Sequence, residues 1–281
     1  MPHPALVPGA VAVITGGASG IGLAAAQRLA ALGLHICIAD LGTERLAAAV
    51  ASLRAHAREE AEIAGFEVDV SDRSALVRLE AAVADRFGGA DVVMNNAAIQ
   101  IPNDALGDEA DWRRLIAINL WGVIDGSQVF APRMIQRGRP GLIINTGSKQ
   151  GITTPPGNPA YNVSKAGVKV YTEALQHQLR NTPDVRISAH LLIPGFVWTP
   201  LAAGDRTEKP AGAWTADDTV DFMLTRLEAG DFYILCPDND VDRALDEKRI
   251  AWATGDLIEN RPPLSRWEPS WAAAFEAFTR S

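Results

Sequence analysis

Tyr161 and Lys165 are four residues apart, and Ser148 lies thirteen residues upstream of the tyrosine. Positions i and i+4 share one face of a helix, so the phenol and the ammonium would lie side by side. A cation beside a phenol favours its ionised form and lowers its pKa. The spacing therefore predicts that Tyr161 acts as a general acid and base near working pH.

A glycine-rich segment near the N-terminus has the form of a nucleotide-binding loop. Residues 11–15 form an apolar run, and Gly16, Gly20 and Gly22 follow it at the start of a helical pattern. In such loops the glycines allow a tight turn, a close approach to a pyrophosphate, and close packing of helix on strand. The helix N-terminus then offers N–H groups to phosphate. A plain tight turn is the alternative, but it does not require the strand before and the helix after.

An acidic residue, Asp40, ends the second apolar run, eighteen residues after Gly22. A carboxylate there would accept hydrogen bonds from the adenosine ribose and would repel a 2′-phosphate. Ser19 in the loop and Leu41 after Asp40 supply no basic group for that phosphate, and Arg45 is interpreted as helix surface. We therefore expect NAD in preference to NADP. The alternative for Asp40 is a loop or helix-capping residue.

Short apolar runs alternate with helical patterns along the chain, which is typical of a parallel sheet covered on both faces. The expected class is α/β, a Rossmann-type doubly wound parallel sheet of about seven strands with helices on both faces. Expected strands are 11–15, 34–40, 66–70, 91–95, 142–145, 186–193 and 232–236. Expected helices are 21–32, 44–57, 73–86, 109–137, 159–180 and 215–229. Asn158 and Thr215 are expected helix caps, the latter in a capping box with Asp218.

No linker or repeat divides the chain, so residues 1–281 are predicted to form a single dehydrogenase domain. A mobile substrate loop is expected at about 200–214, where glycine, proline and charged residues interrupt the alternation. The last expected strand is followed by an extended C-terminal tail, residues 237–281, rich in tryptophan. The acidic run 238–242 in that tail is interpreted as a solvated turn.

Taken together, these motifs resemble the short-chain dehydrogenase/reductase family, in its single-domain NAD-dependent branch. The segment 15–22 resembles the family's cofactor loop, and Asn95-Asn-Ala-Ala98 resembles its Asn-Asn-Ala-Gly segment, with Ala98 in place of glycine. Ser148, Tyr161 and Lys165 match its catalytic set. The remaining matches are Asn119 at the fourth catalytic position, Asp69 and Val70 near the adenine, and Pro194-Gly-x-Val-x-Thr199 near the nicotinamide.

The resemblance implies a role for each catalytic residue. Tyr161 would exchange a proton with the substrate oxygen, and Ser148 would hold that oxygen by a hydrogen bond. Lys165 would lower the pKa of the tyrosine and bind the nicotinamide ribose, while Asn119 would hold a water linking Lys165 to solvent. The expected cofactor-binding residues are Gly16, Ser19, Gly20, Ile21, Gly22, Asp40, Leu41, Asp69, Val70, Asn96, Ala97, Ala98, Tyr161, Lys165, Pro194, Gly195, Val197 and Thr199.

The residues expected to face the substrate are mainly apolar. They are Ile99, Gln100, Ile101, Gln150, Gly151, Trp198 and the 201–214 loop with Trp214. This set contains no clustered arginine, which a strongly anionic substrate would need. We therefore expect a neutral secondary alcohol, cyclic or aromatic, that is oxidised to its ketone; Lys209 or Arg206 in the loop could reverse that expectation.

Two other functions use the same fold. One is a non-catalytic dinucleotide-binding sensor or scaffold, and the intact set of Ser148, Tyr161, Lys165 and Asn119 weighs against it. The other is an epimerase, lyase or dehalogenase acting at the same serine and tyrosine. The phosphate loop and Asp40 weigh against the dehalogenase, since that chemistry needs no dinucleotide.

The composition of the chain limits the kinds of partner that it is expected to bind. The chain has 26 Lys and Arg against 34 Asp and Glu, a formal net charge of −8, and no basic run, so neither nucleic acid nor an anionic membrane is expected. Cys37 and Cys236 lie in apolar runs, and no cluster has metal-ligand spacing. With no export signal or transmembrane stretch, a cytoplasmic protein is expected. We expect a homo-dimer or homo-tetramer built on the helices 109–137 and 159–180.

Overall fold

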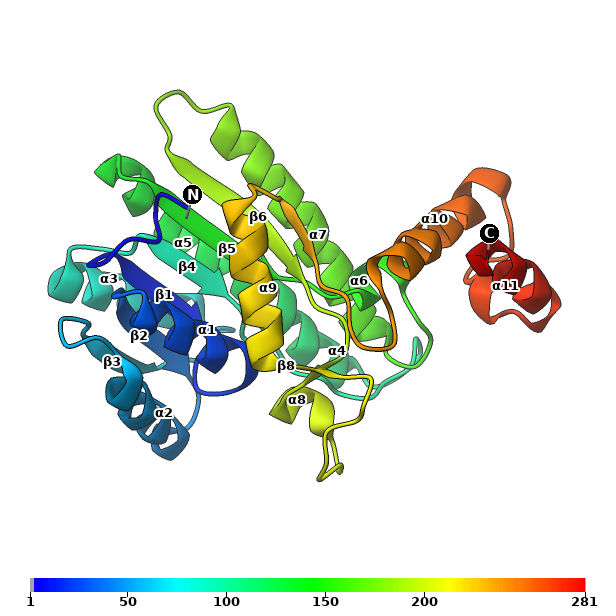
Figure 1. Ribbon diagram of the computed structural model, residues 1–281, viewed down its shortest axis with the longest axis horizontal. Helices are drawn as coiled ribbons and strands as arrows, with labels where there is room; N and C mark the ends of the chain where they lie inside the picture. The colour runs from blue at the N-terminus through cyan, green and yellow to red at the C-terminus, as the bar shows by residue number, and fades with distance from the viewer. Residues whose placement is uncertain (1–2, 281) are drawn as a thin grey trace.

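A seven-stranded parallel sheet, in the order β3-β2-β1-β4-β5-β6-β9, lies at the centre of the computed structural model, which describes residues 3–280 (Figure 1). Strands β1, β4 and β5 are buried along their whole length, which explains why their sequences are apolar without alternation. The strands are β1 (Val11–Thr15), β2 (His35–Asp40), β3 (Ile63–Glu67), β4 (Val92–Asn95), β5 (Gly141–Thr146), β6 (Ile187–Ile193) and β9 (Tyr233–Leu235).

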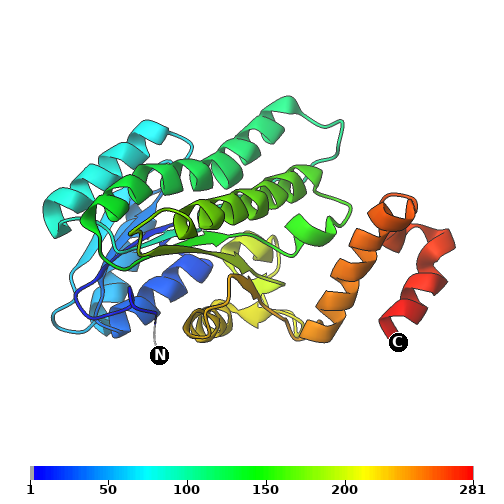
Figure 2. The same ribbon diagram turned by 90° about the horizontal axis from the view of Figure 1, so that it is seen from above.

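Helices cover both faces of this sheet (Figure 2). On one face α1 (Gly20–Ala31), α2 (Thr43–His56) and α9 (Ala216–Glu228) pack on side chains such as Ile14 of β1. On the other face α3 (Arg73–Phe87), α5 (Gly122–Arg137) and α7 (Pro159–Arg180) pack on side chains such as Val13. Successive strand residues thus face opposite helical layers. The predicted fold class is confirmed.

The expected helix 109–137 is interrupted. It is formed by α4 (Glu109–Ile116), a π-helical turn (Ala117–Trp121) and α5. π-turns of this kind within α-helices are frequent at functional sites, and this one contains the buried Asn119.

The third strand differs most from its predicted position. It was expected at 66–70 but runs from Ile63 to Glu67, paired in register with β2. It is an edge strand with exposed positions, so its sequence is less apolar than the residues that follow. Val68 and Val70, which carried the prediction, are buried beyond the end of the strand.

Between β6 and α9 the chain forms a small second sheet. Strands β7 (Val197–Trp198) and β8 (Trp214–Thr215) pair in parallel, and α8 (Pro200–Ala203) lies between them. The expected helix caps are confirmed on both sides of this region. The Asn158 side chain accepts a hydrogen bond from the backbone N–H of Tyr161, and Thr215 and Asp218 form a reciprocal capping box.

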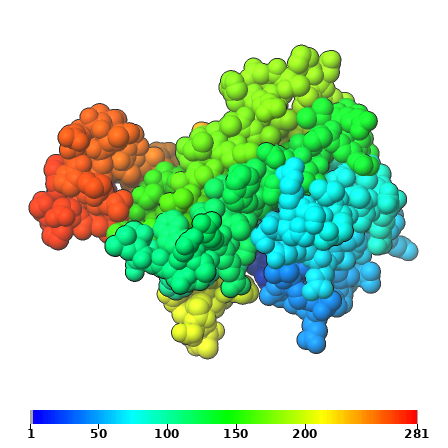
Figure 3. Space-filling model, turned by 180° about the vertical axis from the view of Figure 1, so that it is seen from behind, coloured from blue at the N-terminus to red at the C-terminus, as the bar shows by residue number. Residues whose placement is uncertain are grey.

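The tail projects from one end of the molecule, and its first helix lies next to α6 (Gln150–Thr153) (Figures 1 and 3). It consists of α10 (Arg243–Glu259), two 3₁₀ turns (Ser265–Trp267 and Pro269–Trp271) and α11 (Ala272–Arg280). The Trp252 ring packs at 5.3 Å from Phe275 and 6.3 Å from Trp271, and the Arg261 guanidinium lies 4.0 Å from the Trp252 ring centroid. The tail therefore has an aromatic core of its own. In the described part of the chain, no helix combines the length and hydropathy needed to cross a membrane.

Candidate active site

A cavity of about 850 Å³ opens at the carboxyl ends of the sheet strands. Ligands of open parallel sheets bind at this edge because the strand ends and the helix N-termini converge there. The glycine loop after β1, the ends of β2, β4 and β5, helix α7 and part of the tail all contribute to its wall.

The glycine loop is held by contacts that exclude any side chain. A Cβ on Gly22 would lie 2.2 Å from the carbonyl oxygen of Gly16, and a Cβ on Gly16, whose φ is +64°, would lie 2.8 Å from the Cα of Ala97. Ser19 is the N-cap of α1, but its side chain makes no capping hydrogen bond. The first N–H groups of α1 are therefore left for a ligand, and the loop fits a pyrophosphate.

Asp40 lies at the end of β2 on the cavity wall. One carboxylate oxygen accepts a hydrogen bond from the backbone N–H of Ala18, at 2.9 Å, and thereby fixes the glycine loop. The other oxygen accepts from the N–H of Leu41 and from the guanidinium of Arg45, at 2.8 and 2.9 Å. Arg45 lies on the exposed surface of α2, as interpreted, and it also pairs with Asp40 and lines the cavity.

Asn96 joins the glycine loop to the neighbouring strands. Its amide nitrogen donates to the carbonyl oxygens of Thr15 and Gly16, at 3.2 and 3.3 Å, and its amide oxygen accepts from the Thr146 hydroxyl. The amide of this residue thus positions the loop from the side of β4 and β5.

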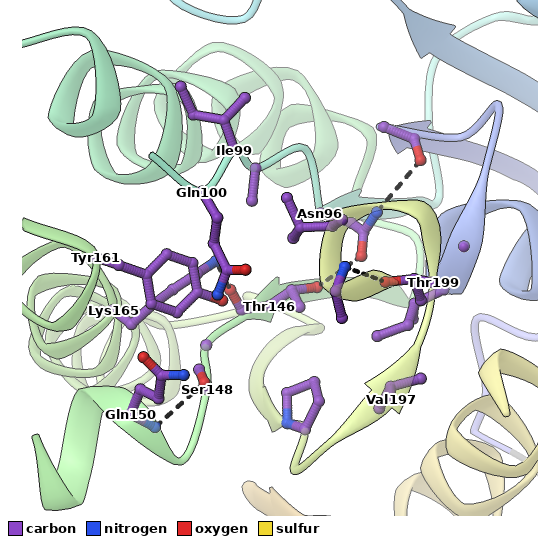
Figure 4. Close-up of a pocket in the computed structure, with 18 of the residues that line it drawn as sticks. Asn96, Ile99, Gln100, Thr146, Ser148, Gln150, Tyr161, Lys165, Val197 and Thr199 are labelled. Atoms are coloured by element: carbon purple, nitrogen blue, oxygen red, sulfur yellow. Dashed lines mark hydrogen bonds between the residues drawn. The ribbon is translucent and has the colours of Figure 1, made fainter. Parts of the chain in front are cut away.

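Ser148, Tyr161 and Lys165 meet at the end of β5 (Figure 4). Helix α7 presents the tyrosine and the lysine on one face, as their spacing predicts, and the Lys165 Nζ lies 5.7 Å from the centroid of the Tyr161 ring. Both side chains are buried, and the Lys165 ammonium donates to the carbonyl oxygen of Thr146 at 2.8 Å. The Ser148 hydroxyl accepts a hydrogen bond from the N–H of Gln150.

The pKa of Tyr161 is shifted in the direction opposite to the one predicted. Burial raises the pKa of this phenol to about 12, and the hydrogen bond with Ser148 only partly opposes the rise. Burial also lowers the pKa of Lys165, to about 8. The predicted acidification of Tyr161 by Lys165 is therefore wrong, because burial disfavours the charged form of each group and is the largest cause of both shifts.

Asn119 supports the site from behind. Its side chain is fully buried and does not line the cavity. The amide oxygen accepts from the N–H of Ile99 at 2.8 Å, and the amide nitrogen donates to the carbonyl oxygen of the same residue at 2.9 Å. This pair of bonds fixes the strand-like segment that packs on the Tyr161 ring.

The structure brings almost all of the expected cofactor residues to one cavity. Gly22 is the exception, since it packs behind the loop. The expected residues that line the cavity are Gly16, Ser19, Gly20, Ile21, Asp40, Leu41, Asp69, Val70, Asn96, Ala97, Ala98, Tyr161, Lys165, Pro194, Gly195, Val197 and Thr199.

The expected substrate residues divide into two groups. Gln100 and Gln150 line the cavity and flank the Tyr161 ring, as does Ile99 beside them (Figure 4). Trp198 does not line it, because successive strand residues face opposite sides and Val197 takes the cavity side of β7. Phe196 lines the cavity instead.

Three further expected substrate residues also fall outside the cavity lining: Ile101, Gly151 and Trp214. Ile101 packs in the apolar cluster around Tyr161. A Cβ on Gly151 would lie 2.5 Å from the backbone of Lys165, so this glycine is a packing residue. The Trp214 ring packs against Phe222 of α9 in the main core.

The cavity-lining residues that no sequence motif indicates lie mainly in the tail. Arg249, Arg266 and Trp267 line the cavity, and no motif placed them there. Asp238 is not in a solvated turn: it is buried, accepts from the N–H of Phe196 and pairs with Lys149 at 3.3 Å. Only the alternation of carboxylates after the last strand could have signalled an internal ion pair. Residues 3–280 contain no group of three or more metal-ligating side chains suited to hold an ion.

The comparisons with known proteins agree with this arrangement. The short chain dehydrogenase family matches residues 10–210, so the chain belongs to that family. A relative from Streptomyces exfoliatus, named 1-deoxy-11-beta-hydroxypentalenate dehydrogenase, is 31% identical over 274 residues, covering 93% of this chain and 94% of the relative. The chain is thus an oxidoreductase of the short-chain dehydrogenase/reductase type.

Two solved structures of similar proteins carry nicotinamide cofactors. A short-chain dehydrogenase from Burkholderia phymatum, in complex with NAD, has a TM-score of 0.81 at 30% identity, covering 91% of this chain and 96% of that one. An alcohol dehydrogenase from Thermococcus sibiricus, complexed with 5-hydroxy-NADP, has a TM-score of 0.69 at 28% identity, covering 78% and 90%. The fold binds a nicotinamide dinucleotide, and both kinds occur among its structural relatives.

Proposed function

We propose that this chain, acting over residues 1–281 as one unit, transfers a hydride between NAD(H) and a secondary alcohol or ketone on an apolar, cyclic or aromatic skeleton. The observation that carries the proposal is the burial of Tyr161 and Lys165 beside Ser148 in the cavity that also contains the glycine loop and Asp40. The nicotinamide would supply the hydride chemistry, and the protein would supply orientation and proton transfer.

The roles of the side chains follow from their positions. Tyr161 would give a proton to the ketone oxygen, or take it from the alcohol, and Ser148 would hold that oxygen. Lys165 would set the charge near the phenol, and Asn119 would position the wall at Ile99. With the pKa of Tyr161 raised to about 12, the free chain holds the phenol protonated, which suits ketone reduction.

NAD is the proposed cofactor because the Asp40 carboxylate lies at the expected ribose position. Its partner Arg45 is 56% exposed and pairs with it at the surface, where an ion pair contributes little. We expect this pair to open and the carboxylate to accept hydrogen bonds from the ribose. A turnover that is faster with NADP than with NAD would contradict this part of the proposal.

The experiment is a screen of cyclic and aromatic secondary alcohols and ketones, read at the NADH absorbance band, on the wild type and on Tyr161→Phe. We expect turnover with NAD and a fall in kcat of about 10²- to 10⁴-fold in the variant. NADH binding, measured by fluorescence, should be unchanged. Normal turnover by Tyr161→Phe would refute the proton-transfer role, and NADH binding without any turnover would favour a sensor.

We also propose a cytoplasmic homo-dimer or homo-tetramer built on α5 and α7. Apolar side chains are exposed near these helices, with Trp121 54%, Val163 50% and Val170 61% exposed. Such a patch is typical of an interaction surface. A monomer in sedimentation velocity at micromolar concentration would refute the assembly.

A further inference from the structure

The tail places two arginines on the wall of the cavity. Arg249 comes from α10 and Arg266 from the 3₁₀ turn before α11, and Trp267 lies next to them. Thr153 also lines this cavity and borders a second pocket together with Arg249, Arg266 and Trp267, and it follows Ser148 and Gln150 along the chain. The arginines therefore belong to the catalytic end of the cavity.

The charges at this end do not balance. Lys149 pairs with two buried carboxylates, with its Nζ 2.6 Å from Asp246 and 3.3 Å from Asp238. Arg249 and Arg266 bring two further positive charges. Three cations thus face two anions, which leaves one positive charge in excess. The other nearby acid, Asp256, is already engaged at 3.0 Å by Arg261 within the tail.

Neither Arg249 nor Arg266 forms an ion pair with a carboxylate in the part of the chain that the structure describes. Among residues 3–280, the buried Nε of Arg249 has no hydrogen-bond partner. The Arg266 guanidinium lies over the rings of Trp267 and Phe275, at 4.8 and 5.1 Å from their centroids. Burial and the charge of Arg249 lower the pKa of Arg266, and the Asp246 carboxylate opposes this shift. A buried donor without an acceptor, beside a second cation, is a costly arrangement that an anion would relieve.

The cofactor phosphates are not this anion. Strand β2, which carries Asp40 and the ribose position, and strand β9, which leads into α10, lie on opposite sides of the sheet. Figure 1 shows α2 and α10 at opposite ends of the molecule. The pyrophosphate position, at Ser19 and Gly20, lies at the central strand β1 between these two ends.

We propose that Arg249 and Arg266 bind a carboxylate on the substrate, and so make this enzyme specific for hydroxy or keto acids on an apolar skeleton. The planar guanidinium matches a carboxylate in two parallel hydrogen bonds. One excess positive charge matches a carboxylate better than the dianion of a phosphate ester. The inference rests on the proposed function and replaces the expectation of a neutral substrate, which assumed a cavity without clustered arginines.

The test compares an acid with its ester. Oxidation of 4-(1-hydroxyethyl)benzoate and of its methyl ester would be measured with NAD on the wild type and on the double variant Arg249→Gln/Arg266→Gln. We expect kcat/KM of the wild type to be about 10- to 100-fold higher for the acid, as for hydrogen bonds to charged groups. The double variant should lose this preference and retain activity on the ester.

A binding measurement keeps the test independent of turnover. Calorimetry on the NAD-saturated protein, with 4-acetylbenzoate as the probe, should detect binding to the wild type and none to the double variant. Arg243→Gln is the matched control, because Arg243 lies on the same helix, is exposed and pairs with Glu247 away from the cavity. This variant should behave as the wild type.

The outcomes separate the two proposals. Equal use of acid and ester by the wild type, or an acid preference that survives in the double variant, would overturn the carboxylate site and leave the dehydrogenase intact. Equal or better use of 4-(1-hydroxyethyl)phenyl phosphate would overturn the choice of a carboxylate. If no alcohol is oxidised, the proposed function fails, and 4-acetylbenzoate binding alone decides whether the arginines form an anion site.

Discussion

The cofactor end and the tail end of the cavity differ in the chemical groups that make their contacts. At the cofactor end, backbone groups and short side chains meet at fixed positions, such as Gly22 against the carbonyl of Gly16 and Asp40 against the N–H of Ala18. At the tail end, long side chains meet, such as Lys149 with Asp246 and Arg261 over Trp252. Backbone geometry constrains residue type strongly. Contacts between long side chains allow many sequences, so residue types in the tail are less constrained.

The largest expected effect falls on the ion pairs that join the tail to the rest of the domain. Lys149→Met would leave Asp238 and Asp246 buried without their cation, and we expect the free energy of unfolding to fall by about 3–5 kcal/mol. Denaturant titration measures it. Arg113→Met is the control, because Arg113 makes an exposed i,i+4 pair with Glu109 that contributes about 0.3–0.5 kcal/mol. Equal losses in the two variants would show that the buried network does not join the tail to the body.

The buried Lys165 should make a pH-dependent contribution to stability. Burial lowers the pKa of Lys165 to about 8 from 10.5, so between these pH values the unfolded chain holds a proton that the folded chain has released. The contribution of Lys165 to the free energy of unfolding should therefore rise with pH across this window, by about 3 kcal/mol. Burial raises the pKa of Cys37 and Cys236 to about 12, which acts in the opposite direction, so the contribution of Lys165 is the difference between the wild type and a Lys165 variant.

The measurement is the free energy of unfolding at pH 7.5 to 10.5 for the wild type and Lys165→Met. The difference between the two proteins should change by about 3 kcal/mol in favour of the wild type as the pH rises. A wild-type curve parallel to that of Lys165→Met would contradict the lowered pKa.

A pair of glycine substitutions tests how strongly each end constrains residue type. In Gly22→Ala the new methyl would meet backbone that cannot move, so we expect a cost of about 1–3 kcal/mol and weaker NADH binding. In Gly255→Ala the methyl would meet the Arg261 side chain, 2.2 Å from its Nη2, and this side chain can turn away. NADH affinity should then be unchanged. Equal loss of NADH affinity in both variants would remove the distinction between the two ends.

The smallest effect is expected within the tail itself. Arg261→Lys keeps a positive charge beside Asp256 but removes the planar guanidinium that lies over the Trp252 and Trp271 rings, a contact that contributes about 0.5–2 kcal/mol. We expect faster hydrogen exchange of α10 and α11 with the exchange of β1 and β4 unchanged. Arg243→Met, at an exposed position of α10, should leave the exchange of all four elements as in the wild type. Faster exchange throughout the sheet would show that the tail and the body unfold together.

The sequence predicted the cofactor end far better than the tail end. Gly16, Gly20, Asp40, Ser148, Tyr161 and Lys165 all lie where their spacing placed them, because strand ends and helix faces convert spacing directly into position. The prediction that Trp198 and Trp214 face the substrate was wrong. Side chains alternate along the short strands β7 and β8, which turns Trp198 away from the cavity, and Trp214 packs on α9. Arg249 and Arg266 carried no signal, because their approach to the cavity depends on how α10 leaves the sheet.

The sequence by itself determined three features: the parallel sheet, the family and the cofactor edge. They follow from the order of the apolar runs, the glycines and the tyrosine–lysine pair, since each depends on local periodicity and backbone freedom. The tertiary structure alone decided which charged side chains of the tail line the cavity and how burial shifts the pKa values of Tyr161 and Lys165. Both depend on burial and on contacts between segments a hundred residues apart, as between Lys149 and Asp246. Such long-range contacts leave no regular spacing in a sequence.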